Sequence, residues 1–185
     1  MKLSLAALAS LTLLTVVALA GCSEPSTPIK PAPDNTVEAE IPDVQTIAGR
    51  TFENGVLTTP DMKLSITDYR VIPVGAEGNE YGNTPLLAIW YDTTHLGTPD
   101  REVSPLAAFI VNFMAYQDND PNIVNKLSMG ALPDDTYFDT QSATLKPGGT
   151  IANAVSYQLT DTTTPVDLVA IHPLGEVGRM TFTLN

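Results

Sequence analysis

Short segments in which apolar and polar residues alternate recur along the chain from about Arg50 onward. Met62 to Thr67, Val166 to Ala170 and Met180 to Leu184 each place every second residue on one face, as a half-buried β-strand does. Turn-forming residues separate them, and Asn54-Gly55 between two apolar pairs is typical of a two-residue β-hairpin. Because no series of long helical segments alternates with them, the pattern predicts about eight strands in an all-β, immunoglobulin-like antiparallel β-sandwich.

Two of the expected strands carry further information. In the first, the apolar positions are even up to Ile66 and odd from Tyr69, so a strand that continues through Thr67-Asp68 needs a β-bulge there. In the second, Leu86 to Tyr91 is continuously apolar, which is typical of a central strand covered on both faces.

The segment from Leu106 to Tyr116 fits two structures. Phe109, Val111 and Phe113 alternate as in a strand, whereas Phe109, Phe113 and Tyr116 also follow helical spacing. We favour a strand over the whole segment because of its aromatic and β-branched residues, and a helix is the alternative.

Two connections are long and polar, namely Gly75–Asn83 and Asp118–Asp139. Long polar loops on a sandwich commonly carry its contacts with partners, so these are the candidate contact surfaces. Shorter turns are expected at Pro147-Gly148-Gly149 and at Thr160 to Thr164.

The N-terminus is organised differently from the rest. Lys2 precedes an uncharged apolar run that ends in Leu19-Ala20-Gly21-Cys22, which contains the only cysteine of the chain. A basic start, an apolar centre and small residues at the cleavage site are the layout of a secretory signal. The cysteine resembles the lipobox of bacterial lipoproteins, which implies cleavage before Cys22 and lipidation (palmitate) of its sulfur. An uncleaved spanning helix and an ordinary signal sequence are the alternatives.

This interpretation divides the chain into three regions. Residues 1–21 are the expected signal peptide, residues 22–49 the lipidated Cys22 with a Pro-rich disordered linker, and residues 50–185 the immunoglobulin-like domain. We therefore expect a lipid-anchored protein on the extracellular face of the bacterial cell membrane. With its single cysteine committed to lipid, the domain is expected to have no internal disulfide.

The charge of the chain narrows the choice of partners. Its 21 acidic and 9 basic residues give a formal net charge of −12. Nucleic acids and anionic lipid or wall polymers need clustered Lys and Arg, so we exclude them as electrostatic partners. The acidic excess is explained by solubility or, more specifically, by a cationic partner or a divalent metal.

Four short stretches resemble an uncharacterised domain family of Gram-positive lipoproteins. They are residues 54–63 (NGVLTTPDMK), 117–120 (QDND), 132–135 (LPDD) and 163–166 (TTPV), within a match over about 50–185. That family is similar to telokin-like, immunoglobulin-like domains of exported bacterial proteins. The resemblance implies a β-sandwich and an envelope location, and it supplies no catalytic residue or ligand.

No catalytic constellation is evident, so we predict no catalytic residues and no cofactor. His95 and His172 are expected in ordinary surface or loop positions, and no serine lies in a Gly-x-Ser-x-Gly elbow. Phosphate-loop, dinucleotide-binding and zinc-ligand spacings are absent from the sequence. Trp90, within an apolar strand, is expected in the core rather than as a sugar platform, which weakens the case for a glycosidase.

Calcium is the one metal that the sequence suggests. Asp118, Asp120 and Asn122 have the spacing of the first ligands in a calcium loop, but Ile123 and Met129 replace the required Gly and Glu. A looser site that includes Asp134 or Asp135 is the alternative to a polar turn in which these side chains cap backbone groups. We assign no metal ligands.

These observations favour a non-enzymatic, membrane-anchored surface lipoprotein that binds or scaffolds a protein or another cell-envelope component. The alternatives are a calcium-stabilised adhesion-type module and a cell-envelope hydrolase of unfamiliar design.

Overall fold

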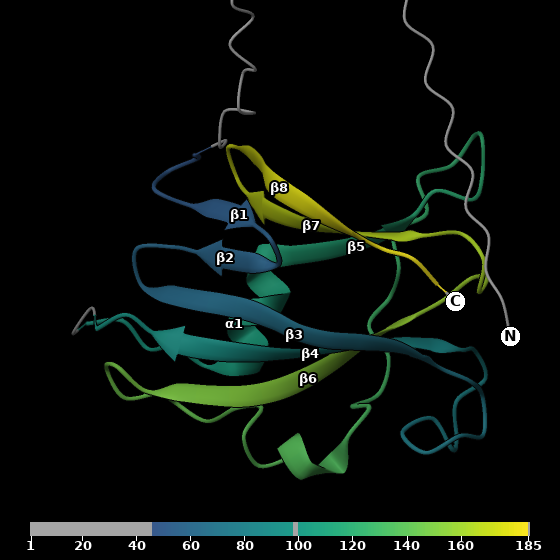
Figure 1. Cartoon of the computed structure of the whole chain (residues 1–185), viewed down its shortest axis with the longest axis horizontal. Coiled ribbons are helices and arrows are strands. Elements are labelled where there is room, and N and C mark those ends of the chain that lie inside the picture. The colour runs from purple at the N-terminus through teal and green to yellow at the C-terminus, as the bar shows by residue number, and fades with distance from the viewer. Residues whose placement is uncertain (1–45, 98–99, 185) are drawn as a thin grey trace, which may run out of the picture. The chain divides into compact units, whose positions relative to one another are not determined.

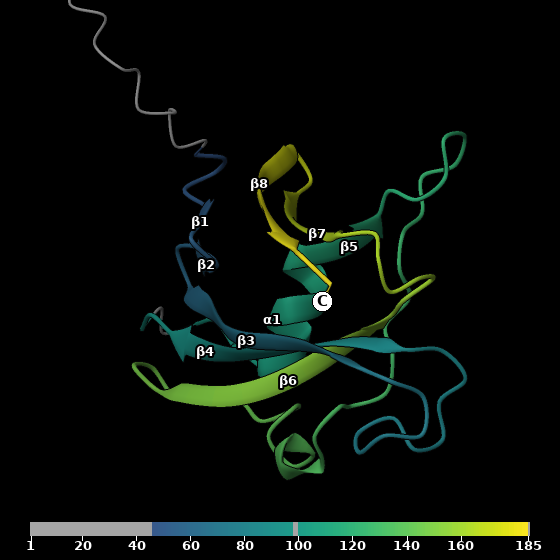
Figure 2. The same ribbon diagram turned by 45° about the vertical axis from the view of Figure 1, so that its right-hand side comes forward.

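Two antiparallel sheets face each other in the computed structural model, which describes residues 46–97 and 100–184 (Figures 1 and 2). The larger sheet has the order β1 (Thr51–Glu53), β2 (Val56–Thr58), β3 (Met62–Ile72), β4 (Leu86–His95) and β6 (Thr150–Gln158). The smaller sheet has the order β5 (Phe113–Gln117), β7 (Val166–His172) and β8 (Gly175–Phe182). The all-β sandwich expected from the sequence is confirmed.

The β1–β2 hairpin and the bulge in β3 lie where the sequence predicts them. Glu53 pairs with Val56, and the two turn residues between them, Asn54 and Gly55, have φ values of 49° and 74°. Positive φ at both positions is what a type I′ turn requires. The register of β3 against β4 shifts between Ile66 and Asp68, which moves the following residues to the opposite parity.

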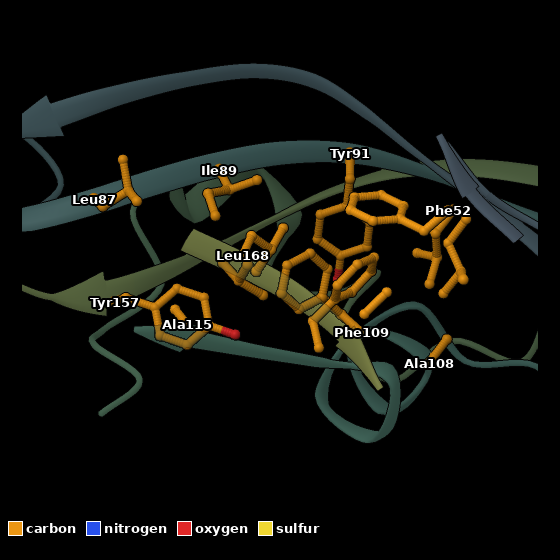
Figure 3. Packing of buried hydrophobic residues seen from close by; sticks show 14 of the residues in the cluster. Phe52, Leu87, Ile89, Tyr91, Ala108, Phe109, Ala115, Tyr157 and Leu168 are labelled. Atoms are coloured by element: carbon orange, nitrogen blue, oxygen red, sulfur yellow. The ribbon is translucent and has the colours of Figure 1, made fainter. Parts of the chain in front are cut away.

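β4 is the central strand of the larger sheet, paired with β3 on one side and β6 on the other. Leu87, Ile89 and Tyr91 point into the main core between the sheets, and Figure 3 shows them side by side along the strand. On its opposite face, Leu86 and Ala88 form a second, smaller apolar cluster with Ile72 of β3. Burial on both faces explains the continuous apolar run.

The segment from Leu106 to Tyr116 is both helix and strand, so the prediction of a strand over its whole length is wrong. Helix α1 (Pro105–Asn112) begins with proline in its first turn, a position where the missing N–H costs nothing, and β5 follows at Phe113 without a loop. The helix lies between the two sheets (Figure 2). The ring centroid of its fully buried Phe109 lies 4.7 Å from that of Tyr91 and 4.9 Å from that of Phe113. The Phe109 side chain therefore helps to fill the interior of the sandwich, next to Tyr91 (Figure 3).

A crossing segment, residues 125–131, joins the edges of both sheets. The Gln117 N–H donates to the Asn125 carbonyl and the Leu127 N–H to the Ala115 carbonyl, so this segment first pairs with β5. It then pairs with β6, where the Gly130 N–H donates to the carbonyl of Ser156. The segment therefore covers strand edges that would otherwise be open to pairing with another chain. A short 3₁₀ helix, η1 (Asp135–Tyr137), follows it.

Candidate binding groove

The outer face of the smaller sheet presents a mixed row of charged and aliphatic side chains. Along β7, Leu168 and Ala170 are buried toward the core, so Asp167, Val169 and Ile171 face outward. On the neighbouring strands, Tyr116 lies opposite Asp167, Arg179 opposite Val169, and Glu176 opposite Ile171. Strand pairing thus brings together residues that are far apart in the sequence.

The loop after β5 forms a wall beside this face, and the two enclose a groove of about 690 Å³. Pockets of about 300–1,000 Å³ are typical of ligand sites. The groove is lined by Tyr116, Gln117, Asp118, Asp120, Pro121, Asn122, Ile123, Val124, Asn125, Asp167, Val169, Ile171, Glu176 and Arg179. The candidate contact loop Asp118–Asp139 therefore supplies one wall of the groove through its first residues.

Two aliphatic side chains on the loop are exposed to solvent. Ile123 is 67% exposed and Val124 is 81% exposed, whereas Val169 on the sheet is buried. Contiguous exposed apolar groups with a polar rim are typical of interaction surfaces, and Ile123 and Val124 are neighbours in the chain.

Among the described residues that line the groove, the one cation is already engaged by neighbouring carboxylates. The Arg179 guanidinium donates two hydrogen bonds of 2.8 Å to Glu176 and one of 3.0 Å to Asp167. This pairing raises the pKa of Arg179 and lowers the pKa of Glu176. Four carboxylates line the groove with this guanidinium, namely Asp118, Asp120, Asp167 and Glu176, so its formal charge is −3.

Gln117 fixes the base of the loop from inside the protein. Its fully buried side chain donates from Nε2 to the carbonyls of Asp161 and Thr164, both at 2.9 Å. Its Oε1 accepts from the backbone N–H of Thr160 at 3.0 Å and from the Thr160 hydroxyl at 2.7 Å. One side chain thereby joins the end of β5 to the turn between β6 and β7.

A second set of polar contacts repeats this connection at the surface. Asn119 donates to the Thr160 hydroxyl and to Oδ2 of Asp161, and Asn125 donates to Oδ1 of Asn119. Asp161 also accepts from the N–H groups of Thr164 and Thr163, and the bonds from Thr164, Asn119 and Thr163 hold the pKa of its carboxyl well below the usual range. Asn125 also donates to the Thr160 hydroxyl, so the segment from Asn119 to Asn125 is tied to this turn at both of its ends.

The residues with calcium-loop spacing form a capping turn. Oδ1 of Asp120 accepts from the N–H groups of Asn122 and Ile123 at 2.7 and 3.0 Å, which is a local capping turn. Asp134 instead caps η1 by accepting from Thr136, and these hydrogen bonds lower its pKa. Within residues 46–97 and 100–184, no group of three or more His, Cys, Asp or Glu side chains is placed to hold a metal ion. The geometry thus favours the capping interpretation of this sequence.

The prediction that both histidines lie in surface or loop positions is wrong for His95. Its side chain, at the end of β4, is 1% exposed. Its Nδ1 accepts from the Gly97 N–H, and its Nε2 lies 2.9 Å from the Arg101 carbonyl, which assigns the proton to Nε2. His95 therefore connects two parts of the β4–α1 connection and lies outside the groove. His172, half-buried at the end of β7, accepts at Nδ1 from the Leu174 N–H.

Trp90 is only partly in the core. It is half-buried on the outer face of the larger sheet, beside the second apolar cluster. The Arg70 guanidinium lies 4.7 Å from the centre of its ring.

The other predicted contact loop, Gly75–Asn83, lines a separate groove of about 500 Å³. Buried Asn79 holds this loop by donating to the carbonyls of Ile72 and Thr84. Both loops predicted as contact surfaces therefore border grooves, whereas the sheet residues that line the groove with Asp118–Asp139 were not predicted. The outward positions of β7 and β8 were visible as alternation, and only strand pairing places them against the loop.

Comparison with known proteins gives the family of the chain. Residues 38–170 match the family described as Domain of unknown function (DUF5067), and the chain belongs to that family. No curated protein matches the sequence.

Two solved structures share the fold. A candidate lipoprotein from Staphylococcus aureus subsp. aureus NCTC 8325 superposes with a TM-score of 0.62 at 17% identity, over 73% of this chain and 92% of that chain. A protein from Enterococcus faecalis, whose structure was determined by NMR, superposes with a TM-score of 0.56 at 19% identity, over 76% of this chain and 99% of that chain. The predicted relation to an uncharacterised domain family is confirmed.

Cys22, the predicted signal peptide and most of the predicted linker lie outside the described residues, so their assignment stays a prediction. Among the helices that the structure describes, none is long and apolar enough to cross a membrane.

Proposed function

We propose that this protein is a lipoprotein anchored through Cys22 on the extracellular face of the bacterial membrane, where its sandwich acts as a non-enzymatic binding module. The partner binds in the groove between the loop that follows β5 and the outer face of the β5-β7-β8 sheet. The groove is the observation that carries this proposal, because it combines exposed Ile123 and Val124 with a charged floor.

Rigid support of the groove favours a binding role. Gln117, Asn119 and Asn125 hold both ends of the wall segment 117–125 through hydrogen bonds to the turn at Thr160 and Asp161. A loop held in one arrangement loses little conformational entropy when a partner binds, and this preorganisation favours affinity.

The surface location is supported by the lipobox-like sequence at Cys22. The structural similarity to a candidate lipoprotein from S. aureus is consistent with it. A Cys22→Ala variant is expected to lose incorporation of a palmitate analogue and to leave the membrane fraction, because an acyl anchor supplies about 0.8 kcal/mol per buried CH₂.

Site-specific photo-cross-linking in intact cells tests the binding role. A photoreactive amino acid at Val124, in the groove, is compared with the same amino acid at Leu174, which is 77% exposed and does not line the groove. We expect a discrete cross-linked species from position 124 and not from position 174. If both positions gave the same products, or neither gave any, the groove would not be a binding site.

A further inference from the structure

We propose that the groove selects a peptide segment of a partner protein that combines lysine or arginine with aliphatic residues. This inference rests on the proposed binding function and specifies the chemistry of the partner.

Charge is the first reason for a basic peptide. Asp118 and Asp120 lie on the loop wall with no basic partner among the described lining residues, because Arg179 is committed to Glu176 and Asp167. A formal charge of −3 remains, and a concave surface of one sign concentrates ligands of the opposite sign. The anionic lipids and polymers of the envelope are repelled by the same charge.

The aliphatic part of the groove is the second reason. Ile123 and Val124 on the loop wall line the groove with largely exposed aliphatic side chains, and Val169 lines it from the sheet. A lysine or arginine side chain has an aliphatic stem and a charged head, so its stem can lie against these side chains while the head reaches a carboxylate. Aliphatic residues between the basic ones bury the remaining apolar surface.

Backbone pairing does not explain binding at this place. The edge of β5 next to the loop already pairs with residues 125–127 of the crossing segment, so a peptide cannot extend the sheet there. Recognition at the groove therefore depends on side chains, which makes the identity of the peptide residues decisive.

Fluorescence polarisation with three labelled nonapeptides tests the proposal. The peptides alternate Lys with Val, Lys with Ser, or Glu with Val, and they are titrated with the intact lipoprotein in non-ionic detergent. We expect the Lys/Val peptide to bind about tenfold more tightly than either of the others, and its affinity to fall between about 50 and about 500 mM salt.

Charge-matched variants locate the binding. Asp118→Asn with Asp120→Asn removes two groove charges, and the amide introduced at position 120 retains an oxygen for the capping bonds. Glu53→Gln with Glu102→Gln removes two exposed charges that do not line the groove. We expect the first variant to weaken Lys/Val binding by about tenfold and the second to leave it within about twofold.

Two results would overturn the proposal. Equal binding of the Glu/Val peptide would exclude charge selection, and equal weakening by both double variants would show only bulk attraction between a basic peptide and an acidic protein. If the position-124 cross-link persisted in cells while no peptide was preferred, the binding function would stand and the basic-peptide inference would fail. If the position-124 cross-link and the peptide preference were both absent, the binding function and the basic-peptide inference would both fail.

Discussion

Gln117 shows how one residue determines the position of a loop. Its side chain is fully buried at the end of β5, and its amide satisfies two carbonyls and the N–H of Thr160 in a turn more than forty positions away in the sequence. The buried amide is a specific link, because its own donor and acceptor atoms would be desolvated without a partner if these bonds were lost.

Replacement of Gln117 by leucine is expected to lower the free energy of unfolding by about 2–4 kcal/mol, because it leaves Thr160 and the carbonyls of Asp161 and Thr164 without their partner. Urea denaturation measures the change. Gln158→Leu, at an exposed glutamine, is the control and is expected to change stability by about 0.5 kcal/mol or less. Similar losses in both variants would mean that the network contributes little.

Asp161 predicts a dependence of stability on pH. Hydrogen bonds from Thr164, Asn119 and Thr163 lower the pKa of its carboxylate in the folded protein. A lowered folded pKa contributes stability that is fully present above the unfolded value of about 3.9 and is lost as pH falls through the folded value. We expect the stability advantage of the wild type over Asp161→Asn to shrink below about pH 4. Denaturation at neutral and acidic pH measures it, and a constant difference would contradict this role.

At the scale of elements, helix α1 is the feature that departs most from a simple sandwich. It lies between the sheets, and Phe109 contacts the rings of Tyr91, Phe113 and Tyr157 (Figure 3). Burial raises the pKa of both tyrosines, as expected where hydroxyl groups lie within an apolar core.

Phe109→Ala is therefore expected to destabilise the protein by about 3–5 kcal/mol, because it leaves a cavity between the sheets. The neighbouring residue supplies the control, since Ile110 is 48% exposed and Ile110→Ala is expected to cost about 1 kcal/mol or less. Thermal or urea unfolding compares the two. Equal destabilisation would indicate that α1 does not fill the core as described.

The ambiguity of this region in the sequence has a physical origin. Both patterns are real, because the chain changes from helix to strand at Phe113. The Phe113 N–H still donates to the Phe109 carbonyl as the cap of α1, and Phe113 and Ala115 alternate within β5. Local periodicity cannot locate a junction that has no loop residues. In contrast, the Asn54-Gly55 hairpin and the bulge after Ile66 depend on local backbone geometry, so the sequence alone predicted them.

The groove was only half predictable for a related reason. The loop that begins at Asp118 is evident from its polar composition. Its opposite side includes Val169, Glu176 and Arg179, which the pairing of β7 with β8 brings together. The burial of His95 was not predicted, because its ring is held by hydrogen bonds to the backbone of Gly97 and Arg101, which residue spacing does not reveal.

At the scale of the whole molecule, a predicted lipid anchor at Cys22 is combined with a sandwich whose candidate groove lies on the smaller sheet. From the formal net charge of −12 we expect repulsion of anionic envelope components. Under the proposed function, specific recognition depends on the groove rather than on the general surface.

Binding at the groove is tested most directly in intact cells that produce a variant with an altered groove. The measured quantity is the amount of partner that is cross-linked to the variant and recovered with it. Ile123→Asp with Val124→Asp removes the exposed aliphatic wall, whereas Val74→Asp with Leu174→Asp alters two exposed aliphatic residues outside the groove. The partner is fixed with formaldehyde, and the variants are compared only if their melting temperatures equal that of the wild type. We expect about tenfold less partner to be recovered with the groove variant than with the wild type, and the same amount with the control variant. Equal recovery from all three proteins would contradict the claim that this groove binds the partner.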